Sequence, residues 1–184
     1  MPLHEFMHAY AGYILGDTTA KIEGRLSLNP LKSIDPFMTV ILPLITLVLF
    51  GFPILAAKPV PFNPYRVKFQ EYGAAILAAA GPFTNLILSI IGVLIVKSVN
   101  PVGFLYTFLG YFVSLNVVLF VFNLIPIPPL DGSRILFAFA PEGIQDFMHR
   151  IERYGFFIII AFILIGGTLL GNLYQDVLSF VLKI

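Results

Sequence analysis

Charged residues are scarce in this chain, and cysteine is absent. Asp, Glu, Lys and Arg make up only 11% of the 184 residues, less than half of the roughly 25% that is typical of soluble domains. This shortage argues against a soluble globular domain, a disordered segment and a nucleic-acid-binding module. The formal net charge of +1 implies no strongly acidic or basic partner. Without cysteine, the chain has no disulfides and no thiolate-ligated metal site.

Apolar sequence is abundant instead: 58% of the residues are hydrophobic and the mean hydropathy is +0.92. Four stretches contain no charged residue, and they cover residues 36–57, 72–96, 98–130 and 154–175. Each is at least as long as the roughly 20 apolar residues that cross a bilayer. The sequence therefore predicts an all-α polytopic membrane protein: one membrane-embedded domain over residues 1–184, with about four or five transmembrane helices in the lipid bilayer.

Helix and turn patterns divide the chain further. The expected helices cover residues 2–16, 72–96, 102–125 and 154–175. The apolar run 36–57 contains prolines and a glycine, so it either spans the membrane or re-enters it. Three prolines between residues 59 and 64 force extended backbone. We therefore expect a short extended segment over residues 57–64.

The distribution of Lys and Arg predicts the orientation in the membrane. If every uncharged run crossed the membrane, Lys and Arg would not favour either side. If instead the run 36–57 is re-entrant, so that residues 36–71 return to the side from which they started, the loops 17–35, 58–71 and 131–153 share one face. That face carries nine of the eleven Lys and Arg, against Lys97 and Lys183 on the other. The positive-inside rule makes it the cytoplasmic face. The extended segment 57–64 is then expected to be partly membrane-embedded, in the cytoplasmic half.

The first residues carry the clearest chemical motif. His4-Glu5-Phe6-Met7-His8 matches H-E-x-x-H. On a helix, positions i and i+4 share a face, so both imidazoles can bind one zinc ion while Glu5 acts on a zinc-bound water. A purely structural pair of histidines is the alternative, but ionisable residues in apolar segments are costly and usually functional. The motif predicts one Zn²⁺ per chain.

A catalytic zinc site usually has three protein ligands and one open position. His149 lies in a polar loop beside Arg150, and we expect it to be a solvated surface residue. Asp131 directly follows the long uncharged run and a proline-rich stretch, and Gly132 permits a tight turn there. Asp131 is therefore the expected third ligand. The alternative is that it caps the N-terminus of the next short helix.

Three motifs together resemble the site-2 proteases, the intramembrane zinc metalloproteases of regulated intramembrane proteolysis. They are H-E-x-x-H at residues 4–8, Gly81-Pro82-Phe83-Thr84-Asn85, and Asn123 followed by Leu130-Asp131-Gly132. Residues 24–30 and 57–61 resemble the compact prokaryotic branch of this family. The resemblance implies that His4, His8 and Asp131 hold the zinc and that Glu5 is the catalytic base. It also implies single-span membrane-protein substrates and a prokaryotic cell membrane.

Two asparagines are further candidates. Asn85 lies one helical turn after Gly81, and Asn123 shares a helix face with Asn116. Asparagine in a membrane helix often makes interhelical hydrogen bonds. The resemblance favours a second role, in which Asn85 and Asn123 face the zinc cavity and support the oxyanion or the substrate backbone.

The expected function is hydrolysis of peptide bonds in or near transmembrane helices, without nucleic-acid partners and with a possible homo-oligomer. One alternative is a metal-binding membrane transporter that uses His4, His8 and Asp131 as its transport site, which leaves Glu5 without a role. The other is a catalytically silent relative, because the family has more residues before H-E-x-x-H than the three found here.

Overall fold

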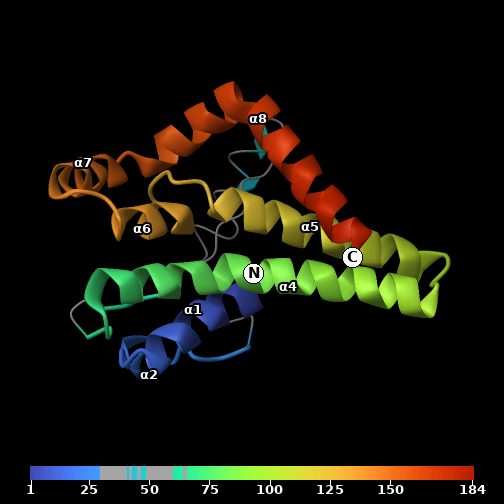
Figure 1. Cartoon of the computed structure of the whole chain (residues 1–184), viewed down its shortest axis with the longest axis horizontal. Coiled ribbons are helices and arrows are strands. Elements are labelled where there is room, and N and C mark those ends of the chain that lie inside the picture. The colour runs from blue at the N-terminus through green and yellow to red at the C-terminus, as the bar shows by residue number, and fades with distance from the viewer. Residues whose placement is uncertain (30–40, 42, 45–46, 49–59, 64–65) are drawn as a thin grey trace.

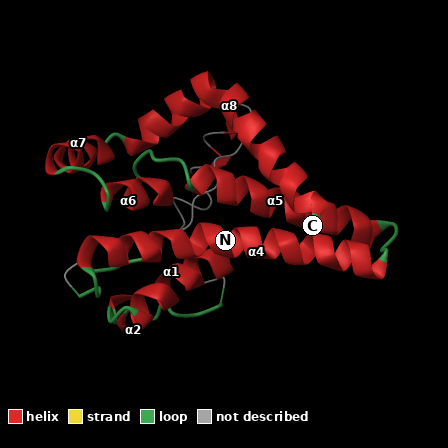
Figure 2. Cartoon of the chain, in the orientation of Figure 1, coloured by secondary structure: helices red, strands yellow, loops and turns green. Residues whose placement is uncertain are grey.

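The structure is a computed structural model, and it describes residues 1–29, 41, 43–44, 47–48, 60–63 and 66–184 (Figure 1). Over these residues the chain is helical and contains no strand (Figure 2). The helices are α1 (Pro2–Ile14), α2 (Thr19–Ile22), α4 (Gln70–Val99), α5 (Phe104–Asn123), α6 (Asp131–Phe137), α7 (Glu142–Glu152) and α8 (Gly155–Lys183).

Three of the described helices, α4, α5 and α8, are long and apolar enough to cross a membrane. They confirm the predicted all-α membrane class. The total of four or five spans stays a prediction, because most of the run 36–57 lies outside the described residues. Of the predicted extended segment, residues 57–59 and 64 also lie outside them, and residues 60–63 have neither helical nor strand structure.

The helix boundaries follow local sequence. Both α4 and α5 begin and end within three residues of the predicted limits. Helix α1 ends at Ile14, slightly earlier than predicted, and the chain then turns through Gly16, which has a φ of 103° that favours glycine. Helix α8 continues to Lys183, well beyond the predicted end at residue 175. The single charge of Asp176 does not interrupt it, since residues 177–183 contain no glycine or proline.

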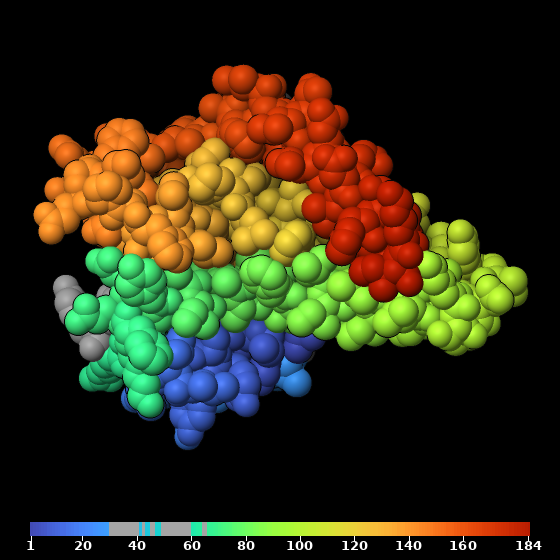
Figure 3. Space-filling view, viewed as in Figure 1, coloured from blue at the N-terminus to red at the C-terminus, as the bar shows by residue number. Residues whose placement is uncertain are grey.

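Helix α4 is the central element of the described part, because α1, α5, α6 and α8 all contact it. In the space-filling view it separates α1 from α5 and α6 (Figure 3). Its first half buries the small residues Ala75, Ala78 and Gly81, which let neighbouring backbones approach closely. Its second half joins α5 and α8 in an apolar core built on Val93, Val113, Val117 and Val181. One rigid helix thus supports both elements that carry the predicted metal ligands.

Candidate metal centre

Helix α1 presents its two histidines to α4. His4 and His8 are both buried, with 4% and 5% of their surface exposed, whereas Glu5 between them is half-buried. The contact depends on Gly81 of α4, because a Cβ atom there would lie only 2.3 Å from His8 Nε2 and 2.7 Å from His4 Cε1. The absence of a side chain at this position lets the two imidazoles reach the α4 backbone.

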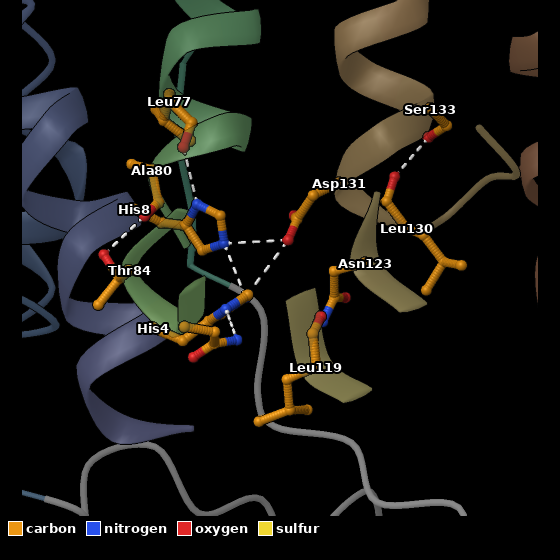
Figure 4. Close-up of polar contacts among 11 residues, drawn as sticks. His4, His8, Leu77, Ala80, Thr84, Leu119, Asn123, Leu130, Asp131 and Ser133 are labelled. Atoms are coloured by element: carbon orange, nitrogen blue, oxygen red, sulfur yellow. Dashed lines mark hydrogen bonds and ion pairs between the residues drawn. The ribbon is translucent and has the colours of Figure 1, made fainter. Parts of the chain in front are cut away.

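Asp131 reaches the same place from α6. The prolines after residue 125 end α5, and the chain turns back tightly enough that a Cβ atom on Gly132 would lie 2.2 Å from the carbonyl oxygen of Leu124. This confirms that the turn depends on glycine at position 132. Leu130 occupies the N-cap position of α6, and Asp131 is the first residue inside the helix. Its carboxylate points toward α1 (Figure 4).

Three potential ligand atoms converge between these helices (Figure 4). The Nε2 atoms of His4 and His8 are 3.0 Å apart, and each lies 3.3 Å from Oδ2 of Asp131. A tetrahedral zinc ion with ligands at about 2.0–2.1 Å keeps its ligand atoms roughly 3.3 Å apart. Within the described residues, His4, His8 and Asp131 therefore form a cluster with the spacing that a zinc ion requires.

The chemistry of the three atoms also fits a cation. Oδ2 of Asp131 is buried and has no hydrogen-bond partner in the described structure. His8 Nδ1 lies 2.7 Å from the carbonyl oxygen of Leu77. Because a carbonyl only accepts, Nδ1 carries the proton and the neutral ring turns the lone pair of Nε2 toward Asp131. Buried acceptors facing one another at this distance are unfavourable unless a cation lies between them.

Asn85 of α4 holds the second imidazole. Its amide lies 3.0 Å from Nδ1 of His4, and the side chain is 1% exposed. The two ends of an amide exchange places by a half-turn, so Oδ1 of Asn85 can accept the Nδ1–H of His4 from this position. Metal-binding histidines usually donate their second ring N–H to such a partner, which fixes the ring. The structure therefore places Asn85 beside a predicted ligand.

The other candidates lie differently. The amide of Asn123 donates to the carbonyl oxygen of Leu119 in its own helix, at 2.9 Å. Its predicted role toward the oxyanion or substrate, like that of Asn85, stays a prediction. His149 is exposed on α7, with Nδ1 3.9 Å from Glu152, which agrees with a surface histidine. The contacts of Leu77 and Asn85 with the imidazoles were not predicted.

Comparison with known proteins identifies the family of this chain. Residues 97–166, which include Asn123 and Asp131, match Peptidase family M50. The chain is 40% identical over 179 residues to the "Putative zinc metalloprotease YwhC" of Bacillus subtilis, an alignment that covers 92% of this chain and 77% of the relative. The chain belongs to peptidase family M50. Membership of M50, the site-2 protease family, confirms the resemblance drawn from the motifs.

More distant M50 relatives carry similar names. The chain is 30% identical over 169 residues to the "Putative zinc metalloprotease Rip2" of Mycolicibacterium smegmatis, covering 88% of this chain and 62% of that protein. It is 33% identical over 97 residues to the "Putative zinc metalloprotease MJ0611" of Methanocaldococcus jannaschii, covering 52% and 49% of the two chains. The chain thus spans a little under two thirds of Rip2. No solved structure matches it.

Proposed function

We propose that this M50 protein is an intramembrane zinc metalloprotease that hydrolyses peptide bonds in or near the transmembrane helices of single-span membrane proteins. The observation that carries the proposal is the convergence of His4, His8 and Asp131 on one buried point, with Glu5 on the same helix as the histidines. The flanking helices α4 and α5 are long enough to cross a membrane. The site therefore lies among elements that a membrane would surround.

Peptide hydrolysis requires metal ligands and a residue that transfers protons, and different side chains of this chain supply them. A zinc ion held by His4, His8 and Asp131 would supply Lewis-acid polarisation of the scissile carbonyl and acidify the attacking water. Glu5 takes the proton of that water and later passes it to the leaving amine, which is general acid–base catalysis. Burial of the ligands keeps bulk water away and strengthens these electrostatic interactions.

The substrate must unwind before it is cut, because the peptide bonds of a helix are shielded by their own hydrogen bonds. Segment 60–63, with the rest of the predicted extended stretch 57–64, offers a route: an unwound peptide can pair with its backbone as an added strand. The excess of Lys and Arg on one predicted face supports a prokaryotic cell-membrane location with the site in the cytoplasmic half. One zinc per chain follows from the single cluster proposed here.

Substitution of Glu5 by Gln tests the mechanism. Purified Glu5→Gln protein in mild detergent is expected to retain its zinc, since no proposed ligand changes, and to lose about 10²- to 10⁴-fold in cleavage of a single-span substrate. Glu23→Gln is the matched control, because Glu23 is exposed in the loop after α2. A zinc chelator should stop wild-type cleavage. Full activity of Glu5→Gln, or cleavage that resists the chelator, would refute the proposal.

A further inference from the structure

A buried carboxylate outside the metal site holds two distant parts of the chain together. Asp17, in the turn after α1, is only 2% exposed. Its Oδ1 accepts the backbone N–H and the hydroxyl of Thr19, at 2.9 and 2.5 Å. Its Oδ2 accepts the backbone N–H of Asn63, at 2.7 Å. Burial disfavours the charge, but these hydrogen bonds hold the pKa of Asp17 below its usual value, so it is ionised at neutral pH.

The bond to Asn63 fixes the segment that precedes α4. The carbonyl oxygen of Asn63 accepts the N–H of Arg66 at 3.0 Å, and the N–H of Lys68 reaches back to the carbonyl oxygen of Leu15 at 2.8 Å. Residues 66–68, just before α4, are thereby linked both to Asn63 and to the C-terminal end of α1. Asp17 supplies the side-chain contact that holds the start of this stretch, at segment 60–63.

The same segment also touches the helix that carries Asp131. The guanidinium of Arg134, one turn after Asp131 on α6, lies 4.9 Å from the centre of the Phe62 ring. Phe62 and Arg134 line a cavity of about 550 Å³, together with residues of α4 and α7. Segment 60–63 therefore bridges the turn that follows α1, the helix with two predicted ligands, and α6, which carries the third.

The hydrogen bond from the N–H of Asn63 to Asp17 determines which backbone edge of segment 60–63 is left for a further peptide. In extended backbone, the polar groups of neighbouring residues point to opposite edges. Pro64 favours extended backbone at Asn63, the residue before it. On such backbone, the N–H of Asn63 is committed to Asp17 and the N–H and C=O of Phe62 point to the other edge. None of the described backbone hydrogen bonds uses these two groups of Phe62. Their edge is thus the one to which a further peptide could bind.

We infer that Asp17 is a positioning residue for the substrate: by binding Asn63 it holds segment 60–63 in place, so that the backbone edge of Phe62 receives the unwound peptide. This inference rests on the proposed protease function. Both carboxylate oxygens of Asp17 accept hydrogen bonds, one from Thr19 of α2 and the other from the N–H of Asn63. An asparagine at position 17 would turn its own N–H donor toward one of these donors. Asp17→Asn keeps the size of the side chain and removes this bridge.

The yield of disulfide cross-linking between position 62 and a bound substrate tests the inference without relying on cleavage. Because the chain has no cysteine, Phe62→Cys introduces a unique thiol. In a Glu5→Gln background the protein binds substrate without cutting it, and a single-span substrate with one cysteine near its scissile region can be oxidised onto position 62. We expect Asp17→Asn to lower the cross-linking yield about tenfold, the typical effect of losing a hydrogen bond to a charged group. The zinc content should stay unchanged.

Kinetics in the active protein provide the second readout. With Glu5 and Phe62 intact, Asp17→Asn should raise KM about tenfold while kcat changes less than about twofold, because the metal site is untouched. Asn63→Pro removes the N–H donor from the other side of the same bond and should have a similar effect. The effects of the two variants should be less than additive in the double variant, since both break the hydrogen bond between Asp17 and Asn63. Asp176→Asn, an exposed carboxylate on α8, is the matched control and should behave as wild type.

Each outcome decides a separate point. If the wild type binds zinc and cleaves, but both Asp17→Asn and Asn63→Pro leave cross-linking and KM unchanged, the inference is overturned and the protease proposal stands. If Asp17→Asn loses zinc or fails to fold, Asn63→Pro alone decides: a normal KM for that variant overturns the inference. If the wild type does not cleave with zinc bound, the protease proposal itself fails.

Discussion

Replacement of Gly81 by Ala tests whether close contact between α1 and α4 forms the metal site. The added Cβ atom would lie 2.3 Å from Nε2 and 2.5 Å from Cε1 of His8, and 2.7 Å from Cε1 of His4. Ordinary van der Waals contact begins at about 3.4 Å. The helices or the two imidazoles must therefore separate by roughly 1 Å to accommodate one methyl group.

A displacement of that size is large for a metal site. Ligand distances in such sites hold within about ±0.2 Å, so the rings cannot keep their places and the new methyl group at once. Overpacking a well-packed contact costs about 1–3 kcal/mol. If this free energy must be overcome to bring the three ligands around the zinc ion, zinc affinity should drop roughly 5- to 150-fold. Cleavage should fall at least as much, since the same imidazoles position the reaction.

Zinc titration with a competing chelator, in detergent, measures the affinity, and thermal unfolding reports whether the helices still pack. Gly110→Ala is the matched control: Gly110 lies within α5, and a Cβ atom there would meet nothing within 4 Å. That variant should bind zinc normally and be as stable as wild type or slightly more so, because Ala favours a helix over Gly. Wild-type zinc affinity and cleavage in Gly81→Ala would refute the reasoning.

Three further predictions concern single side chains. Asp131→Ala should lose zinc during dialysis against a chelator and lose cleavage, because two imidazoles alone remain; zinc retained at one ion per chain would exclude Asp131 as a ligand. Asn85→Ala should weaken zinc binding about 10- to 100-fold by releasing His4, whereas normal zinc affinity with a reduced kcat would indicate an oxyanion role instead. Asp17 has its pKa held low, against the effect of burial, by hydrogen bonds and by the nearby Arg66. Its stabilising contribution is therefore fully present above the unfolded pKa of about 3.9 and is lost as pH falls through the lowered folded value. The difference in Tm between wild type and Asp17→Asn should be constant from pH 7 to 5 and shrink below about pH 4, and a difference that grows on acidification would contradict this.

The sequence could predict the histidine pair and Asp131 because their signals are local. His4 and His8 share a face through helix periodicity alone. Asp131 stands out as a charge at the end of a long uncharged run, in proline-rich backbone that needs a buried or wet environment. These two signals do not give the distance between the helices. That distance depends on Gly81, and its effect on His8 and His4 appears only in three dimensions.

Other contacts had no local signature. Asp17 has no signature in the sequence, since a carboxylate in a turn is usually solvated, and its partner Asn63 lies 46 positions away. The contact of Asn85 with His4 depends on how α4 rotates against α1, which periodicity leaves open. The predicted end of α8 is too early because the uncharged run stops before Asp176, and one exposed charge does not end a helix.

The order of the ligands along the chain determines when the site can form during biosynthesis. At about 5–20 residues per second, the ribosome makes α6 roughly 6–25 s after α1. Until then, α1 and α4 can pack against each other, but only two of the three proposed ligands, His4 and His8, have been made. The third proposed ligand, Asp131, arrives only with α6, after α4 and α5 have been made. On the proposed function, the protein therefore cannot cleave substrates before α6 has been made.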